Sequence, residues 1–263
     1  MKQLKFRVEA RQHIAIVGRT GAGKTSIRLA LLRAVEATGG SIEVDGITIK
    51  DINLDTLRQA ICLVPQDPYL FAGSLQENLD PFDELSTEQI RIALKTVGFA
   101  SDKDIPVGEE KDTSKTGTNL DGSHSSTDLQ NTIEEGGTNL SLGQRQLVCL
   151  ARALLRSPKI VILDEATASV GHATDSRIKD VVSMLPATVI TIAHRLTSVL
   201  DHDKVLVLEQ REVAEFDHPW KLMQKNGLFR ALCQDHGNME ELERIAETAW
   251  RKSNNRSVSS GRA

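Results

Sequence analysis

The spacing of apolar residues near the start of the chain predicts two strands, a glycine-rich turn and a helix. Leu4, Phe6 and Val8 alternate with polar residues, which is typical of a half-exposed strand. An apolar run at residues 14–17 predicts a second, buried strand that ends at a glycine-rich turn. Residues 24–36 then carry apolar side chains at helical spacing, up to a pair of glycines. The predicted order is therefore strand, glycine loop, helix.

Farther along the chain, short apolar runs alternate with amphipathic segments. Asp45-Gly46 is a dipeptide that favours tight turns, so residues 41–50 are expected to form a hairpin. Strands that alternate with helices predict a mainly parallel sheet covered on both faces, and hence an α/β fold. Further strands are expected at residues 60–64, 160–163, 188–192 and 205–208, and helices within residues 74–105, 141–156 and 173–184.

One long stretch, residues 108–132, breaks this alternation because small, polar and charged residues dominate it. Leu120 and Leu129 are nearly its only large apolar residues. Such a segment cannot bury enough surface to offset its ordering entropy, so we expect a mobile insertion. The residues from Arg251 onward are also polar and small, and a frayed end is expected there.

Composition narrows the class of protein. The 263 residues are 40% apolar and 26% charged, which is typical of a globular chain and excludes wholesale disorder. The formal net charge of −4 lacks the basic excess of a nucleic-acid-binding surface, so no nucleic-acid partner is expected. No apolar stretch approaches the ~18 residues of a membrane span. Cys62, Cys149 and Cys233 lie far apart, with no metal-binding spacing, which favours a reduced, intracellular setting.

Residues 18–25 match the pattern GxxxxGK[ST] between a predicted strand and a predicted helix. Glycines at these positions let backbone N–H groups converge on phosphates at the positive end of the helix. Lys24 adds a charge, and the hydroxyl of Thr25 is a ligand for Mg²⁺. The alternative is an idle glycine-rich turn. The candidate nucleotide-binding residues are Gly18, Arg19, Thr20, Gly21, Ala22, Gly23, Lys24, Thr25 and Ser26.

The strand at residues 160–163 is followed by two carboxylates, Asp164 and Glu165. Ligands bind at the carboxyl ends of parallel strands, so Asp164 is a candidate for holding Mg²⁺ through water. Glu165 is then a candidate base for an attacking water molecule. The alternative is a pair of solvated charges at a strand end.

A serine and a glycine begin the helix at residues 141–156. Ser141 and Gly143 leave N–H groups exposed at the positive end of the helix, where an anion can bind. The simpler interpretation is that Ser141 only caps the helix.

Together these motifs resemble an ATP-binding cassette domain, because residues 18–25, Gln66, residues 140–144, Asp164-Glu165 and His194 occur in the order of that family. The resemblance covers residues 4 to about 235, apart from the polar stretch. The sequence is most similar to the second nucleotide-binding domain of subfamily C, the multidrug-resistance-associated exporters. The similar segments are residues 16–24, 64–68, 73–81, 144–155, 164–170 and 191–196.

The resemblance implies a P-loop NTPase core, a small antiparallel β part that is incomplete at the N-terminus, and a helical subdomain. It implies ATP and Mg²⁺ as cofactors and a head-to-tail pair of domains that sandwich two ATP molecules. The implied metal ligands are Thr25, Gln66 and Asp164; the implied catalytic residues are Gln66, Glu165 and His194; and the implied contacts to a partner's nucleotide are Ser141, Gly143 and Gln144.

The resemblance also implies partners and a location. The partners are membrane-spanning domains and a second nucleotide-binding domain, from another chain or a second copy. The location is the cytoplasmic face of a membrane when assembled, and the cytoplasm when alone. The expected domains are residues 1–235, with a helical subdomain at about 74–157, and residues 236–263, a C-terminal helix and frayed tail.

The chain departs from the family pattern at two sites besides the insertion. The aromatic residue that stacks on adenine upstream of the glycine loop is absent, and Gly171 stands where the family usually has aspartate. These departures leave open a truncated, non-hydrolytic or regulatory remnant. A soluble cassette protein of repair or translation is a further alternative, but it would carry a second cassette or a long coiled coil. A simple P-loop kinase would have no use for Ser141 or Glu165.

Overall fold

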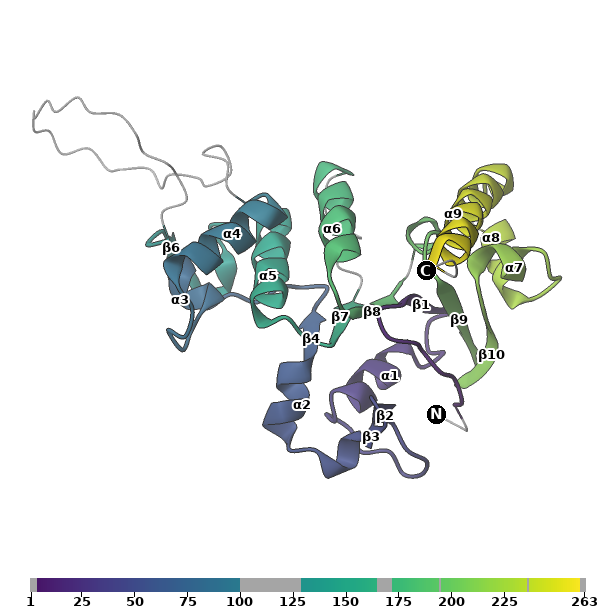
Figure 1. Cartoon of the computed structure of the whole chain (residues 1–263), viewed down its shortest axis with the longest axis horizontal. Coiled ribbons are helices and arrows are strands. Elements are labelled where there is room, and N and C mark those ends of the chain that lie inside the picture. Colours follow the sequence, from purple (N-terminus) through teal and green to yellow (C-terminus); the bar gives the residue numbers. More distant parts are fainter. Residues whose placement is uncertain (1–3, 100–128, 165–171, 194, 236, 261–263) are drawn as a thin grey trace, which may run out of the picture. The chain divides into compact units, whose positions relative to one another are not determined.

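The computed structural model describes residues 4–99, 129–164, 172–193, 195–235 and 237–260 (Figure 1). The chain packs as two units. The first contains residues 1–66, 157–168 and 186–263, and the second contains residues 67–156 and 169–185. The second unit therefore begins before residue 74, where the sequence places the helical subdomain, and it also takes in residues 169–185.

A six-stranded sheet forms the centre of the first unit, in the order β10-β9-β1-β8-β7-β4. Every neighbouring pair is parallel except β10 and β9, which are antiparallel. The mainly parallel sheet predicted from the alternation is therefore confirmed. The strands are β1 (His13–Gly18), β4 (Ile61–Val64), β7 (Ile160–Asp164), β8 (Thr188–Ile192), β9 (Lys204–Glu209) and β10 (Glu212–Asp217).

Alternation along the central strands divides the core between the two faces of the sheet. On β1, Ile14 and Ile16 belong to one buried cluster, whereas Ala15 and Val17 belong to the other. The first face is covered by α1 (Lys24–Leu31) and α2 (Leu54–Ala60), and the second by α7 (Pro219–Met223), α8 (Leu228–Asp235) and α9 (Met239–Ser260) (Figure 1). Because both faces are buried, these strands read as continuous apolar runs in the sequence.

The second unit is mainly helical. Its helices are α3 (Leu75–Leu79), α4 (Thr87–Val97), α5 (Leu142–Arg156) and α6 (His172–Met184), with a short antiparallel pair, β5 (Gly73–Ser74) and β6 (Thr132–Ile133), and a 3-10 turn, η2 (Glu135–Gly137). Ser74 and Ser86 begin α3 and α4 with reciprocal side-chain caps. Each cap satisfies N–H groups that the first helical turn leaves without a partner.

The small elements of the first unit lie between α1 and β4. The hairpin β2 (Glu43–Val44) and β3 (Ile47–Thr48) turns at Asp45-Gly46, as predicted, and the 3-10 turn η1 (Ile49–Asp51) follows it. A second 3-10 turn of this unit, η3 (Leu196–Ser198), lies between β8 and β9. Arg33 donates hydrogen bonds to the carbonyl oxygens of Ile49 (3.0 Å) and Ile52 (2.7 Å). These bonds tie the end of α1 to the segment after the hairpin.

Three predictions about single elements differ from the structure. The alternating residues at the chain start form no strand, although Leu4, Phe6 and Val8 do pack against the core. The first helix ends at Leu31, well before residue 36, and α9 continues to Ser260, beyond the point at which a frayed tail was expected. Most of the predicted mobile insertion, residues 108–128, lies outside the described residues.

Candidate functional site

The glycine loop joins the end of β1 to the start of α1, where the sequence places it. Gly18 ends β1 with φ of +154°, and Gly23 precedes α1 with φ of +108°, both of which favour glycine. A Cβ atom on Gly18 would lie 2.5 Å from the backbone oxygen of Leu208. Only a residue without a side chain therefore lets β1 turn into the loop this close to β9.

The N-terminus of α1 has the features of an anion-binding site. Gly23 offers no side-chain cap to the first turn, and the first turn contains no acidic residue. The N–H groups there remain donors at the positive end of the helix dipole. Thr25 and Ser26 are exposed on this first turn, so their hydroxyl groups are accessible to a ligand.

Lys24 brings a buried cation to the same loop. Its side chain is only 7% exposed, and its ammonium donates a 2.6 Å hydrogen bond to the carbonyl oxygen of Gly18. A buried ammonium is costly unless it is paired. This bond holds Lys24 over the loop, where phosphate oxygens would be stronger acceptors than a neutral carbonyl.

A pocket of about 400 Å³ opens beside the loop within the first unit. Gly18, Arg19, Thr20 and Lys24 form one side of it, and the pocket is completed by Val17, Ala193, Leu196, Leu232 and Asp235. Ala193 follows β8 and directly precedes His194 in the sequence. The end of β8 therefore reaches the same pocket as the glycine loop.

Three candidate residues follow the carboxyl ends of parallel strands. Gly18 ends β1, Asp164 ends β7 and Gln66 follows β4, and β4 pairs with β7 in register from Ile61 to Val64. Because these strands are parallel, the three residues lie at one edge of the sheet, where ligands bind in open α/β folds. Asp164 is 17% exposed and forms an ion pair with Arg28 of α1.

The sequence reasoning did not single out Arg28. The only signal was its position, four residues after Lys24, which puts both cations on the same side of a helix. Its carboxylate partner comes from a distant part of the chain, so the ion pair could not be predicted from local pattern. Glu165, His194 and Gly171 lie outside the described residues, and their assigned roles stay predictions.

The start of α5 shows what the serine does in this chain. The backbone N–H of Ser141 donates to Oε1 of Gln144 (2.8 Å), and the N–H of Gln144 donates to Oγ of Ser141 (3.2 Å). This is a reciprocal helix cap, so Ser141 does cap α5, and its role toward a partner's nucleotide stays a prediction. A Cβ atom on Gly143 would lie 3.3 Å from the side chain of Thr174, which leaves little room for a larger residue.

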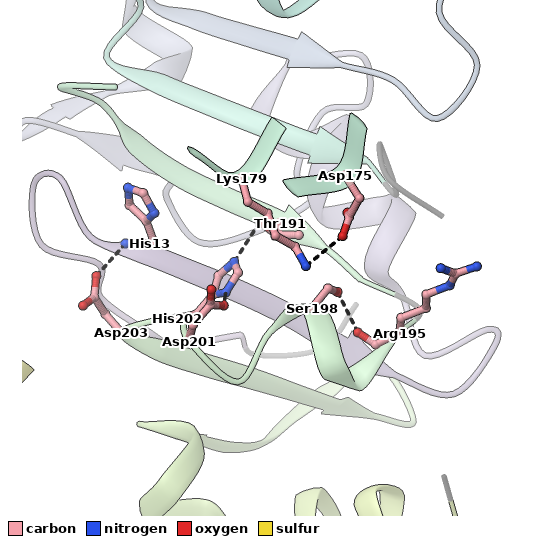
Figure 2. A network of polar contacts seen from close by, with 9 residues as sticks. All are labelled: His13, Asp175, Lys179, Thr191, Arg195, Ser198, Asp201, His202 and Asp203. Carbon is pink, nitrogen blue, oxygen red and sulfur yellow. Dashed lines mark hydrogen bonds and ion pairs between the residues drawn. The ribbon is translucent and has the colours of Figure 1, made fainter. Parts of the chain in front are cut away.

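A separate group of polar contacts joins the segment before β9 to the start of β1 and to Thr191 of β8 (Figure 2). The ring of His202 is 3.0 Å from Oγ1 of Thr191 and 3.2 Å from Asp201, and the N–H of His13 donates to the carboxylate of Asp203 (2.8 Å). Burial, followed by the nearby His202, lowers the pKa of His13.

Comparison with known protein families shows which family the chain belongs to. A family model described as ABC transporter matches residues 1–168, more than half of the sequence. The chain belongs to the ABC transporter family. The resemblance read from the motifs is thereby confirmed.

Relatives of this ABC transporter chain are much longer proteins. It is 46% identical over 255 residues to the "ATP-dependent bile acid permease" of Saccharomyces cerevisiae, a match that covers 95% of this chain and 15% of the permease. It is 42% identical over 252 residues to "ABC transporter C family member 3" of Dictyostelium discoideum, covering 94% of this chain and 16% of that protein. The chain therefore spans about a sixth of these relatives.

A solved structure supports the fold of this ABC transporter chain. The "Structure of a bacterial Atm1-family ABC exporter with ATP bound" matches with a TM-score of 0.75 and 30% identity, covering 89% of this chain and 38% of that one. The match confirms the P-loop NTPase fold. No helix within the described ranges has both the length and the apolar character needed to cross a membrane.

Proposed function

We propose that this chain is the nucleotide-binding part of a membrane exporter, which binds ATP and Mg²⁺ and hydrolyses ATP to ADP and phosphate. The observation that carries the proposal is the buried ammonium of Lys24 above an uncapped helix N-terminus, at the carboxyl edge of a parallel sheet. Backbone N–H donors, a lysine and a helix dipole together fit a triphosphate. The membership of the ABC transporter family supports the same ligand.

The residues at this edge also fit Mg²⁺. Thr25 offers a hydroxyl, Gln66 an amide oxygen and Asp164 a carboxylate, and hard oxygen ligands of this kind suit Mg²⁺, which also keeps water and substrate phosphates in its shell. The carboxylate of Asp164 already forms an ion pair with a cation, the guanidinium of Arg28. Mg²⁺ bound there would neutralise charge on the phosphates.

The remaining roles are assigned to residues that follow the strand ends. Glu165 is proposed to accept a proton from the attacking water, and His194 to hydrogen-bond the terminal phosphate from the end of β8. Gln66 is proposed to link the nucleotide to the second unit, which begins at the next residue. Lys24 supplies positive charge that complements the phosphates.

The partners proposed are membrane-spanning domains and a second nucleotide-binding domain, at the cytoplasmic face of a membrane. Ser141, Gly143 and Gln144 would then complete the site of the second domain. One relative is named a permease and another an ABC transporter, which supports coupling to transport. A non-hydrolytic or regulatory remnant is the alternative, and Gly171 favours it because glycine cannot make the contacts of an aspartate across the paired domains.

Two substitutions separate binding from hydrolysis. Glu165→Gln should keep ATP affinity and lower turnover by about 10²–10⁴-fold, because the amide keeps the shape and loses the basicity. Lys24→Ala should weaken ATP binding itself by about tenfold or more, because it removes a charge that faces the phosphates. Calorimetric titration and phosphate release measure the two effects, and Lys5→Ala, which removes an exposed lysine, is the control.

The results also decide between the alternatives. Parent-like hydrolysis by Glu165→Gln would refute the role of Glu165, and parent-like ATP binding by Lys24→Ala would refute the nucleotide site. ATP binding by the unmodified chain without Mg²⁺-dependent phosphate release, at any protein concentration, would favour the regulatory remnant.

A mixing experiment tests the sharing of sites between two copies. Ser141→Arg should abolish activity in a pair of identical chains without changing the affinity of one chain for ATP. Mixed with Lys24→Ala, it should regain part of the activity, because one composite site stays intact. Ser183→Arg, at an exposed serine of α6, is the matched control and should keep parent activity. If no mixture regains activity where pairs form, sharing is refuted.

A further inference from the structure

Arg28 carries a charge that the proposed chemistry does not use. It lies on α1 one turn after Lys24, and its guanidinium pairs with the carboxylate of Asp164 at the end of β7. The two side chains are 22% and 17% exposed, so water and salt screen the pair only in part. Asp164 is also a proposed ligand of Mg²⁺. One carboxylate therefore has two candidate cations.

The pair is not a fully satisfied structural bridge. Nε of Arg28 is buried and has no hydrogen-bond partner among the described residues. A guanidinium has five N–H donors, and a buried donor without a partner costs free energy. The ion pair therefore gains less than a satisfied one would, and a competing cation has less to displace.

The ion pair between Arg28 and Asp164 lies near the glycine loop, so its charges act on a bound nucleotide. An unpaired carboxylate at this edge would repel the phosphates of a nucleotide held by Lys24 and the N-terminus of α1. While Arg28 pairs with Asp164, that negative charge is neutralised. Two cations, Lys24 and Arg28, four residues apart on one helix repel each other, and the carboxylate between α1 and β7 offsets this repulsion.

We propose that Arg28 is an internal counter-ion that competes with Mg²⁺ for Asp164 and so sets how strongly nucleotide binding depends on Mg²⁺. The inference rests on the proposed function, because it needs a nucleotide at the glycine loop. Without the metal, Arg28 keeps the site permissive for phosphates. With the metal, the guanidinium has to leave the carboxylate. Arg28 is a positioning residue that acts through Asp164.

The test measures ATP affinity of the whole chain by calorimetry, in EDTA and at a series of buffered free Mg²⁺ concentrations. Arg28→Met keeps the apolar stem and removes the charge. We expect the Mg²⁺ concentration that gives half of the gain in ATP affinity to fall about tenfold, which corresponds to about 1.4 kcal/mol. We also expect weaker ATP binding in EDTA, because Asp164 then repels the phosphates.

Three further variants sharpen the test. Arg58→Met removes an exposed arginine of α2 in the same unit and should leave the Mg²⁺ midpoint unchanged. Arg28→Gln keeps an N–H donor group without the charge. It should lower the midpoint as Arg28→Met does, and it serves if the methionine variant does not fold. In an Asp164→Asn background, Arg28→Met should have no further effect on the midpoint.

An unchanged midpoint in the folded Arg28 variants, or an equal shift in Arg58→Met, would overturn the role of Arg28. A shift that persists in the Asp164→Asn background would overturn it as well, because the effect would not pass through that carboxylate. If the unmodified chain binds no ATP at any Mg²⁺ concentration, the nucleotide site itself is refuted, and the inference falls with it. ATP binding with an unchanged midpoint refutes only the counter-ion.

Discussion

Substitution of Gly18 by alanine tests whether the glycine loop is held by backbone geometry. Gly18 has φ of +154°, and an added Cβ atom would lie 2.5 Å from the backbone oxygen of Leu208 and 3.1 Å from Cβ of Ala22. Leu208 pairs with Gly18 in the parallel ladder between β1 and β9. Its oxygen cannot yield without disturbing the centre of the sheet.

The expected cost has two parts. A residue with a side chain in this region of φ costs about 1–3 kcal/mol. Forcing a methyl group against a fixed backbone atom costs about 1–3 kcal/mol more. Gly18→Ala should therefore lower the free energy of unfolding of the first unit by about 2–6 kcal/mol.

Gly40→Ala separates the two parts. Gly40 has φ of +77°, but an added Cβ atom meets nothing within 4 Å, so only the conformational cost of about 1–2 kcal/mol is expected. Urea unfolding followed by tryptophan fluorescence reports on the first unit, because both tryptophans, Trp220 and Trp250, lie in it. Equal losses in the two variants would refute the argument from close packing at Gly18.

Two further predictions concern packing and pH. Arg152 donates hydrogen bonds to the backbone oxygen (2.6 Å) and side-chain oxygen (3.0 Å) of buried Asn78 and to the backbone oxygen of Tyr69 (3.1 Å). Arg152→Met should therefore destabilise the second unit by about 2–3 kcal/mol, measured by circular dichroism in urea. A loss below about 0.5 kcal/mol would contradict this. Burial lowers the pKa of His218 below 6.5, so the folded state resists protonation. The urea concentration at the unfolding midpoint should therefore be highest above pH 6.5 and fall as the pH drops below that value. His218→Asn, which keeps the cap on α7, should reduce this fall. An identical pH profile in the variant would refute the assignment.

Features encoded in a few consecutive residues were predictable from the sequence. The glycine loop between β1 and α1 and the hairpin turn at Asp45-Gly46 depend on local backbone conformation, which residue type limits directly. The buried parallel strands were predictable because both their faces are apolar. The family resemblance then supplied roles for residues such as Gln66 that no local pattern assigns.

Features that depend on distant partners were not predictable. Leu4, Phe6 and Val8 alternate as in a strand, but alternation tells which side chains are buried, and it does not supply a neighbouring strand for the backbone. β10 was missed because its charged residues, Glu212, Glu215 and Asp217, give no regular alternation, and its pairing with β9 shifts register between Val213 and Glu215. The ion pair between Arg28 and Asp164 joins residues more than a hundred positions apart.

Phosphate release per molecule as a function of protein concentration tests the proposed function most directly. The chain is incubated with ATP and Mg²⁺ across a wide range of protein concentrations, with Lys24→Ala as the inactive reference. If two copies share composite sites, the rate per molecule should rise with concentration and level off once the chain is paired, and EDTA should abolish it. No release above that of Lys24→Ala at any concentration would contradict the proposal that this chain hydrolyses ATP.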